Sequence, residues 1–138
     1  MQPPYYIYNM ILLELNTRDS NVCLTLKEKQ TLENPYYLFE VWQTPEEKQY
    51  FLQVDTSDYP DSYNRFSLKP ISSGTPTNGE FLVKNNTDFW NYNVYETATQ
   101  SLDPEDATGL LETGIIRVDT ARPINVTIKQ TSNVITLG

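Results

Sequence analysis

Short runs of alternating apolar and polar residues limit the fold of this chain more than any other feature of the sequence. In residues 36–43, YYLFEVWQ, every second side chain from Tyr37 to Val41 falls on one side of an extended backbone. Similar runs follow along the chain, separated by Pro, Gly, Asn, Asp and Ser, and no long stretch has the period of a helix. The pattern therefore predicts an all-β protein.

The expected strands follow one another at intervals of about 8–12 residues, which is typical of a sandwich or barrel. We predict a single antiparallel β-sandwich domain over residues 1–138, either immunoglobulin-like or a jelly roll, in which residues 1–6, with two prolines, form an extended arm. The strands are expected at residues 7–15, 22–26 (extending toward Lys29), 36–43, 49–55, 63–68, 79–84, 90–97, 110–119, 125–129 and 134–137.

Charge and the missing residue types exclude several classes of function. The 10 Lys and Arg against 18 Asp and Glu give a net charge of −8, which repels nucleic-acid phosphates and anionic membranes. Histidine is absent, so the commonest general base and zinc ligand are missing. We therefore expect no catalytic activity, no cofactor and no nucleic-acid partner. Signal-peptide and membrane-spanning patterns are also lacking, so we expect no membrane association.

The one cysteine, Cys23, rules out a disulfide within the chain. It lies in the apolar run VCLTL, so we expect it to be a small buried side chain.

An acidic loop, TATQSLDPEDATG, separates two alternating runs of residues 90–97 and 110–119. We expect these runs to be antiparallel strands and DPED to form a turn of helix, with Asp103 as N-cap and Pro104 at the first position. Gly114 is expected to mark a β-bulge. The loop lacks the ligand spacing of a calcium-binding EF-hand.

Two other arrangements of carboxylates could form chemical sites. Asp55, Asp58 and Asp61 are spaced three apart in VDTSDYPDSYN, so they could converge on a metal ion or simply form a solvated turn. Glu40, among aromatic residues, could act as the acid of a glycosidase, but no second carboxylate is marked as its partner. We therefore expect Glu40 to lie on a partly exposed face.

Aromatic side chains offer a binding function without chemistry. Trp42, Tyr63 and Trp90 are the candidates for stacking on sugar rings of host or mucosal glycans, as in carbohydrate-binding modules. The alternative is that these aromatic residues belong to the core.

Four segments occur in a shared order: LTLKEKQTLENPYYLFEVW, YNRFSL, NGEFLVKNNTDFWNYNVYE and GLLETGIIRV. Together they resemble small virion proteins of crAss-like and other tailed phages that infect Bacteroidetes. The resemblance implies a non-enzymatic structural protein, made in the bacterial cytoplasm and carried in the virion. Its expected place is the capsid surface, as an auxiliary (decoration) protein that binds the major capsid protein in many copies. A tail- or portal-associated adaptor is the alternative.

Both ends of the chain extend beyond the resembling segments, and their position suggests that they dock on neighbours. An unpaired terminal strand can add to the sheet of another protein. The candidate docking residues are Tyr5, Tyr6, Tyr8, Val134, Ile135 and Leu137.

Overall fold

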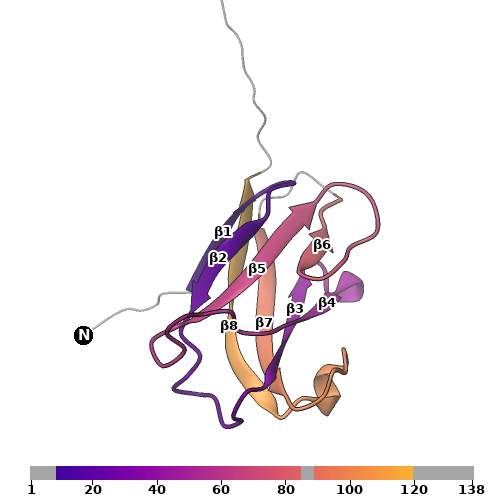
Figure 1. The fold of residues 1–138 in the computed structure, drawn as a ribbon. Coiled ribbons are helices and arrows are strands. Elements are labelled where there is room, and N and C mark those ends of the chain that lie inside the picture. The colour runs from indigo at the N-terminus through magenta and orange to yellow at the C-terminus, as the bar shows by residue number, and fades with distance from the viewer. Residues whose placement is uncertain (1–8, 85–88, 120–138) are drawn as a thin grey trace, which may run out of the picture.

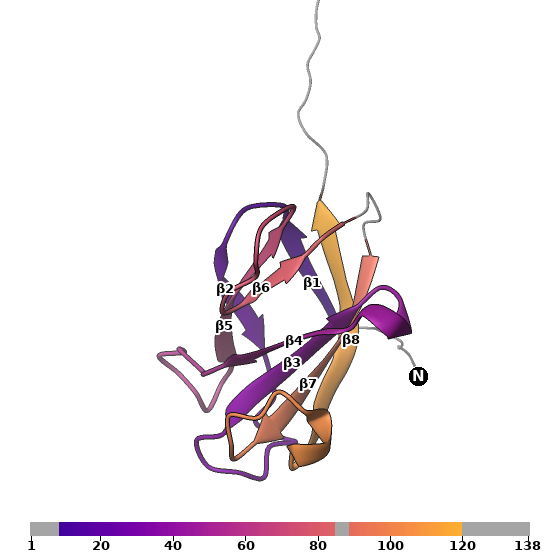
Figure 2. The ribbon, with the colours of Figure 1, turned by 90° about the vertical axis from the view of Figure 1, so that its right-hand side faces the viewer.

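A computed structural model describes residues 9–84 and 89–119 and shows two packed sheets (Figures 1 and 2). The first sheet has five strands in the order β1 (Asn9–Glu14), β8 (Gly109–Asp119), β7 (Phe89–Thr97), β3 (Tyr36–Trp42) and β4 (Gln49–Gln53). The second has three, in the order β2 (Asp19–Leu24), β5 (Asn64–Ile71) and β6 (Glu80–Leu82). Two short 3₁₀ turns, η1 (Pro45–Glu47) and η2 (Pro104–Asp106), follow β3 and β7. The predicted all-β sandwich is confirmed.

All eight strands occur close to their predicted positions. The largest differences are in β2, which begins at Asp19 rather than residue 22, and in β5, which extends to Ile71 rather than residue 68. The strands predicted at residues 125–129 and 134–137, and the arm of residues 1–6, lie outside the described residues.

The strand order identifies which kind of sandwich the chain forms. The series β8-β7-β3-β4, opposed to the pair β2-β5, is the arrangement of immunoglobulin-like sandwiches rather than of a jelly roll. Two pairs depart from the predicted antiparallel pattern, because β1 runs parallel to β8 and β6 runs parallel to β5. The turn after β1, with Asn16 at φ 62°, leads β2 into the opposite sheet, so β1 pairs with β8 instead.

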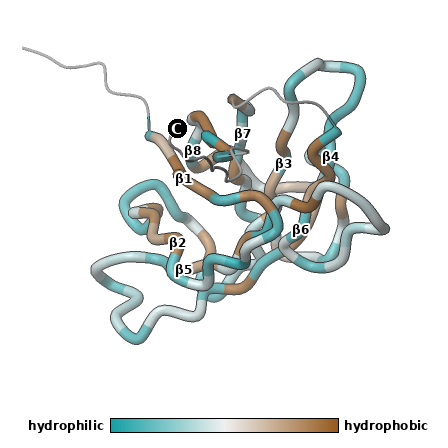
Figure 3. Tube along the Cα trace, turned by 90° about the horizontal axis from the view of Figure 1, so that it is seen from above, coloured by the Kyte–Doolittle hydropathy of each residue, from teal (hydrophilic) through white to brown (hydrophobic). Residues whose placement is uncertain are grey.

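Alternation along the strands places one set of side chains between the sheets and the other set outside. In Figure 3, hydrophobic and hydrophilic residues follow one another along the strands. At the centre, Phe66 of β5 meets the edges of Tyr37 and Phe39 of β3, with ring centroids 5.2 Å apart in each pair. Phe39 also stacks on Phe51 of β4 at 5.2 Å. These contacts join both sheets into one core.

Gly114 has a different role from the predicted one. The register shift in the β7–β8 pair lies between Val94 and Tyr95, where Val94 faces Glu112 and Tyr95 faces Leu110, so the bulge is at Leu111. A Cβ at Gly114 would lie 2.4 Å from the Asn9 carbonyl oxygen and 2.7 Å from the ring of Tyr92. The glycine therefore lets β1 and the buried Tyr92 ring approach β8.

Cys23 is exposed rather than buried. Residues Val22 and Leu24 on either side of it face the core, and the alternation of β2 turns Cys23 outward. The apolar run VCLTL concealed this alternation, because cysteine itself counts as an apolar residue.

The close approach at Gly114 predicts that adding one methyl group there lowers the stability of the fold. Gly114→Ala should lower the free energy of unfolding by about 1–3 kcal/mol, because the new Cβ overlaps backbone and a buried ring. Gly109→Ala, in the same strand with open space around it, should change stability by less than about 0.5 kcal/mol. Urea unfolding of the two variants measures the difference, and equal stability would contradict this role of Gly114.

Candidate interaction surface

An apolar strip crosses the outer face of the five-stranded sheet near β1. Met10 of β1 lies opposite Ile115 of β8, while Leu12 lies opposite Arg117, which in turn faces Phe89 of β7. Leu12 is 64% exposed and Phe89 is 52% exposed. We call Met10, Leu12, Ile115 and Phe89 the apolar strip. Exposed apolar side chains grouped in this way are characteristic of interaction sites.

A second apolar group lies at the other end of the same face. Leu110 of β8 lies opposite Tyr95 of β7, and Leu102, from the β7–β8 loop, lines a surface groove with Val54. Leu102, Leu110 and Val54 are all more than half exposed. Six of the seven large hydrophobic side chains that are exposed in residues 9–84 and 89–119 therefore lie on or beside one face, the exception being Tyr59.

The β7–β8 loop holds Leu102 in place through its own hydrogen bonds. The side chain of Asp103 accepts a hydrogen bond from the Glu105 amide at 3.0 Å, and Pro104 follows at the first position of η2. Gln100 Nε2 donates to the Tyr36 hydroxyl of β3 at 2.9 Å. The capped turn predicted for DPED is confirmed, and it serves to order a loop at the edge of the outer face.

Glu40 lies between the two apolar groups, and its carboxylate is satisfied from several sides. Asn93 Nδ2 donates to Oε1 at 2.8 Å, the Tyr95 hydroxyl donates at 3.1 Å, and Lys48 Nζ lies 3.5 Å from Oε2. Only 3% of Glu40 is exposed, so the residue itself is buried, although the face on which it lies is partly exposed at the half-buried Trp42. Because its oxygens are occupied by fixed partners, Glu40 forms a polar centre on this face.

Two tyrosines beside Glu40 respond to its charge. Burial and then the neighbouring Glu40 carboxylate raise the pKa of Tyr95. Burial, followed by the hydrogen bond to Glu40, also raises the pKa of Tyr50. Both hydroxyls therefore remain protonated donors around the carboxylate.

The three proposed sugar-stacking residues do not share a surface. Trp90 is only 4% exposed and packs edge-on against Phe81 at 5.1 Å, so its assignment as a surface stacking residue was wrong. Trp42 is half-buried on the outer face, with Lys48 Nζ 4.7 Å from its ring centroid. Tyr63 lies in another region, beside Tyr59 at 6.4 Å.

The aspartates considered for a metal site interact with other groups of the protein, two of them with Arg65. Asp55 accepts from the Arg65 amide at 3.0 Å, and Asp58 forms an ion pair with the Arg65 side chain at 3.8 Å. Asp61 lies 3.8 Å from Lys27. Within the part of the chain that the structure describes, no three acidic or cysteine residues gather as metal ligands. Asp55 instead accepts a hydrogen bond from the Ser57 amide at 2.8 Å, as in the alternative of a turn.

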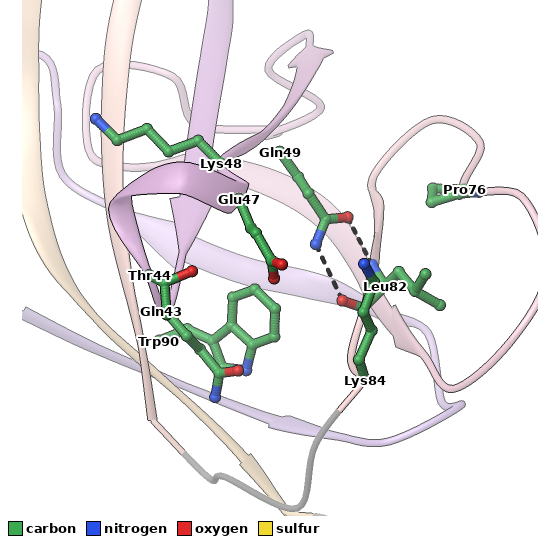
Figure 4. A pocket seen from close by; sticks show the side chains of 9 residues that line it. All are labelled: Gln43, Thr44, Glu47, Lys48, Gln49, Pro76, Leu82, Lys84 and Trp90. Atoms are coloured by element: carbon green, nitrogen blue, oxygen red, sulfur yellow. Dashed lines mark hydrogen bonds between the residues drawn. The ribbon is translucent and has the colours of Figure 1, made fainter.

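A pocket of about 380 Å³ opens beside the β3–β4 turn (Figure 4). Its wall includes the indole of Trp90, whose Nε1 is buried without a hydrogen-bond partner. The Gln49 side chain closes another side, because its Oε1 accepts from the Leu82 amide at 2.7 Å and its Nε2 donates to the Leu82 carbonyl at 3.0 Å. Gln49 therefore joins β4 to β6 where no backbone pairing connects the sheets.

The sequence analysis did not predict that two carboxylates, Glu96 and Glu112, are buried. Glu96, at the end of β7, accepts hydrogen bonds from the Thr31 amide at 2.9 Å, the Thr31 hydroxyl at 2.7 Å and the Leu32 amide at 2.9 Å. Glu112 accepts from the Tyr92 hydroxyl. The alternation of Trp90, Tyr92 and Val94 in the sequence would have placed Glu96 on the inner face. For Glu112 the alternation along β8 gives no such indication, because the bulge at Leu111 interrupts it.

Several candidate docking residues lie outside the described residues: Tyr5, Tyr6, Tyr8, Val134, Ile135 and Leu137. Among residues 9–84 and 89–119, no helix has the length and apolar character needed to cross a bilayer.

No protein-family model, curated protein or solved structure matches this chain.

The environment of Glu112 predicts a pH-dependent effect. Burial raises the pKa of Glu112, although the hydrogen bond from Tyr92 and the charge of Lys29 act in the opposite direction. The folded state therefore disfavours the charged form, and the stability that the protonated group contributes is lost as pH rises through the folded pKa. Relative to the native chain, Glu112→Gln should gain stability between about pH 4 and about pH 8.

Urea unfolding at both pH values measures this gain. The exposed Glu105→Gln is the matched control and should follow the native protein at both values. A stability difference between Glu112→Gln and the native chain that is the same at low and high pH would contradict the assignment.

Proposed function

We propose that this protein is a non-enzymatic structural protein of a tailed-phage virion, an auxiliary protein of the capsid surface. The observation that carries the proposal is the gathering of exposed apolar side chains on the outer face of the five-stranded sheet. That face would dock on other virion proteins, principally the major capsid protein.

The physical support comes from the rigidity and chemistry of this face. Its strands are held by the continuous pairing of β3 with β7 and by the pairing of β7 with β8 on both sides of the bulge at Leu111, so a partner would meet a preformed surface. Apolar side chains at each end surround the polar centre at Glu40, which resembles the mixed composition of protein interfaces. On a capsid lattice, many copies of a modest contact would act together through avidity.

The carboxylates of the chain support a non-enzymatic role. Glu40, Glu96 and Glu112 are all nearly buried, and each accepts hydrogen bonds from the protein itself. Such groups act as structural acceptors rather than as a pair of acids across a cleft. The placement in a phage rests on the resemblance of the four segments, and a tail or portal adaptor would use the same kind of surface.

A glycan-binding role has less support from the surface. Lys48 lies over Trp42, and Tyr63 lies in another region, so these aromatic rings do not form a shared platform. A sugar that quenches tryptophan fluorescence and binds at Trp42 would nevertheless favour this second role over docking in a particle.

The copy number in purified particles tests the proposed place in the virion. Absolute quantification by mass spectrometry should find on the order of hundreds of copies per particle, because a capsid lattice repeats its sites. About a dozen copies would instead indicate a portal or tail position, where the symmetry is lower. Absence of the protein from washed particles would overturn the structural role.

A matched pair of variants tests the proposed face. Phe89→Ser removes an exposed ring from the apolar strip, whereas Tyr59→Ser removes a ring elsewhere that is more exposed, at 66% against 52%. Phe89→Ser should reduce incorporation into particles at least about tenfold, because a central aromatic contact can dominate an interface. Tyr59→Ser should incorporate normally. Equal incorporation of both variants would exclude Phe89 from the docking surface, and unfolding measurements would show that both remain folded.

A further inference from the structure

The four edge strands of the sandwich differ in how they resist pairing with another chain. β2 has a register irregularity between Asp19 and Val22, and β6 has only three residues. β4 is tied to the opposite sheet by Gln49 and by Gln53, which contacts the Ser67 amide and Asn78. Bulges, short strands and covered edges are the usual protections against edge-to-edge association.

β1 has none of these protections within the described residues. It keeps six consecutive pairs with β8, from Asn9 opposite Gly114 to Glu14 opposite Asp119, without a bulge. Its sequence, NMILLE, contains no proline or lysine, and its other side has no strand partner in the described sheet. An edge that is regular, apolar and unprotected favours the addition of another strand.

A groove of about 550 Å³ runs beside this edge, between β1 and the start of β2. Its acidic side chains are those of Glu14, Asp19 and Asp119. Arg18 also lines the groove, but its guanidinium is engaged with the Ser67 hydroxyl at 2.8 Å and with Glu80 at 3.5 Å. The groove therefore suits an extended, basic segment.

The C-terminal segment, residues 120–138, has the complementary composition. It contains Arg122 and Lys129 and no Asp or Glu, which gives a charge of +2. Residues 9–84 and 89–119 contain 8 Lys and Arg and 17 Asp and Glu, which gives 8 − 17 = −9. Within the segment, residues 124–129 read INVTIK, a strict alternation of apolar and polar side chains with the same length as β1.

One antiparallel register matches this segment to the groove. With residue 126 opposite Leu12, Val126 and Ile128 would extend the apolar strip beside Leu12 and Met10. Asn125 and Thr127 would then lie opposite Leu13 and Ile11, on the side of β1 where Thr17, Ser20 and Asn21 also line the groove. Arg122 would arrive at the acidic end near Glu14.

We infer that residues 124–129 of a second copy of this chain add to β1 as an antiparallel strand, with Arg122 at the acidic end of the groove. The same chain is a poor donor, because the β1–β2 turn lines the groove at the end where β8 stops. Residues 120–123 would have to pass over this turn and reverse direction. The inference does not depend on the virion role, since it concerns two copies of the chain in any setting.

Charge reversal distinguishes exchange between copies from folding back within one copy. Glu14→Lys reverses the charge at position 14 of the groove, and Arg122→Glu reverses the charge at position 122 of the donor segment. Sedimentation velocity of the full chain, between roughly 10 and 200 μM, should show association for the native protein and at least about tenfold weaker association for each single variant. A reducing agent prevents disulfide dimers through the exposed Cys23.

Mixing the two single variants is the decisive experiment. The positive charge introduced by Glu14→Lys can meet the negative charge introduced by Arg122→Glu only between molecules, so the mixture should regain association. Glu46→Lys, an equal charge change on the exposed η1 turn, should associate like the native chain. A native chain that remains monomeric over this range, or a mixture that associates no better than either single variant, would overturn the inference.

Discussion

The contact between Phe66 and the β3 aromatics is the interaction on which the rest of the structure depends. Phe66 of the three-stranded sheet forms T-shaped contacts with Tyr37 and Phe39 of β3. Phe39 in turn stacks on Phe51 of β4, so the packing connects one sheet to two strands of the other. Aromatic side chains bury a large apolar area in a fixed geometry. Without a disulfide in the chain, this packing carries the cohesion that a staple supplies in smaller domains.

Polar side chains connect the parts that this core does not reach. Asn64 accepts from the Leu26 amide at 3.0 Å and donates to Asp55 at 2.9 Å, while Tyr37 donates to Gln30 at 2.6 Å. Burial, reinforced by the negative charges of Asp55 and Glu96, raises the pKa of Tyr37 to about 12, so its hydroxyl remains a donor at neutral pH. The segment between β2 and β3 is therefore attached to the sandwich without regular strand pairing.

The same inner packing leaves two features available to partners. Alternation in β1, β7 and β8 commits Ile11, Val94 and Ile116 to the core and turns the apolar strip outward. The crossing of the chain after β1 leaves that strand at the margin of its sheet, with β8 as its described neighbour. Docking through the face and strand addition at the edge would use adjacent but distinct parts of the protein, one through side chains and the other through backbone groups.

The sequence by itself determined the fold class, the approximate position of all eight described strands and the capped turn at Asp103, because alternation and turn residues are local signals. The tertiary structure decided which side of each strand became the core. It showed Trp90 and Glu40 to be buried and Cys23 to be exposed, and the three aspartates form no group of metal ligands within the described residues. These outcomes depend on register, on the bulge at Leu111 and on the parallel pairing of β1, which arise from contacts between residues that are distant in the sequence.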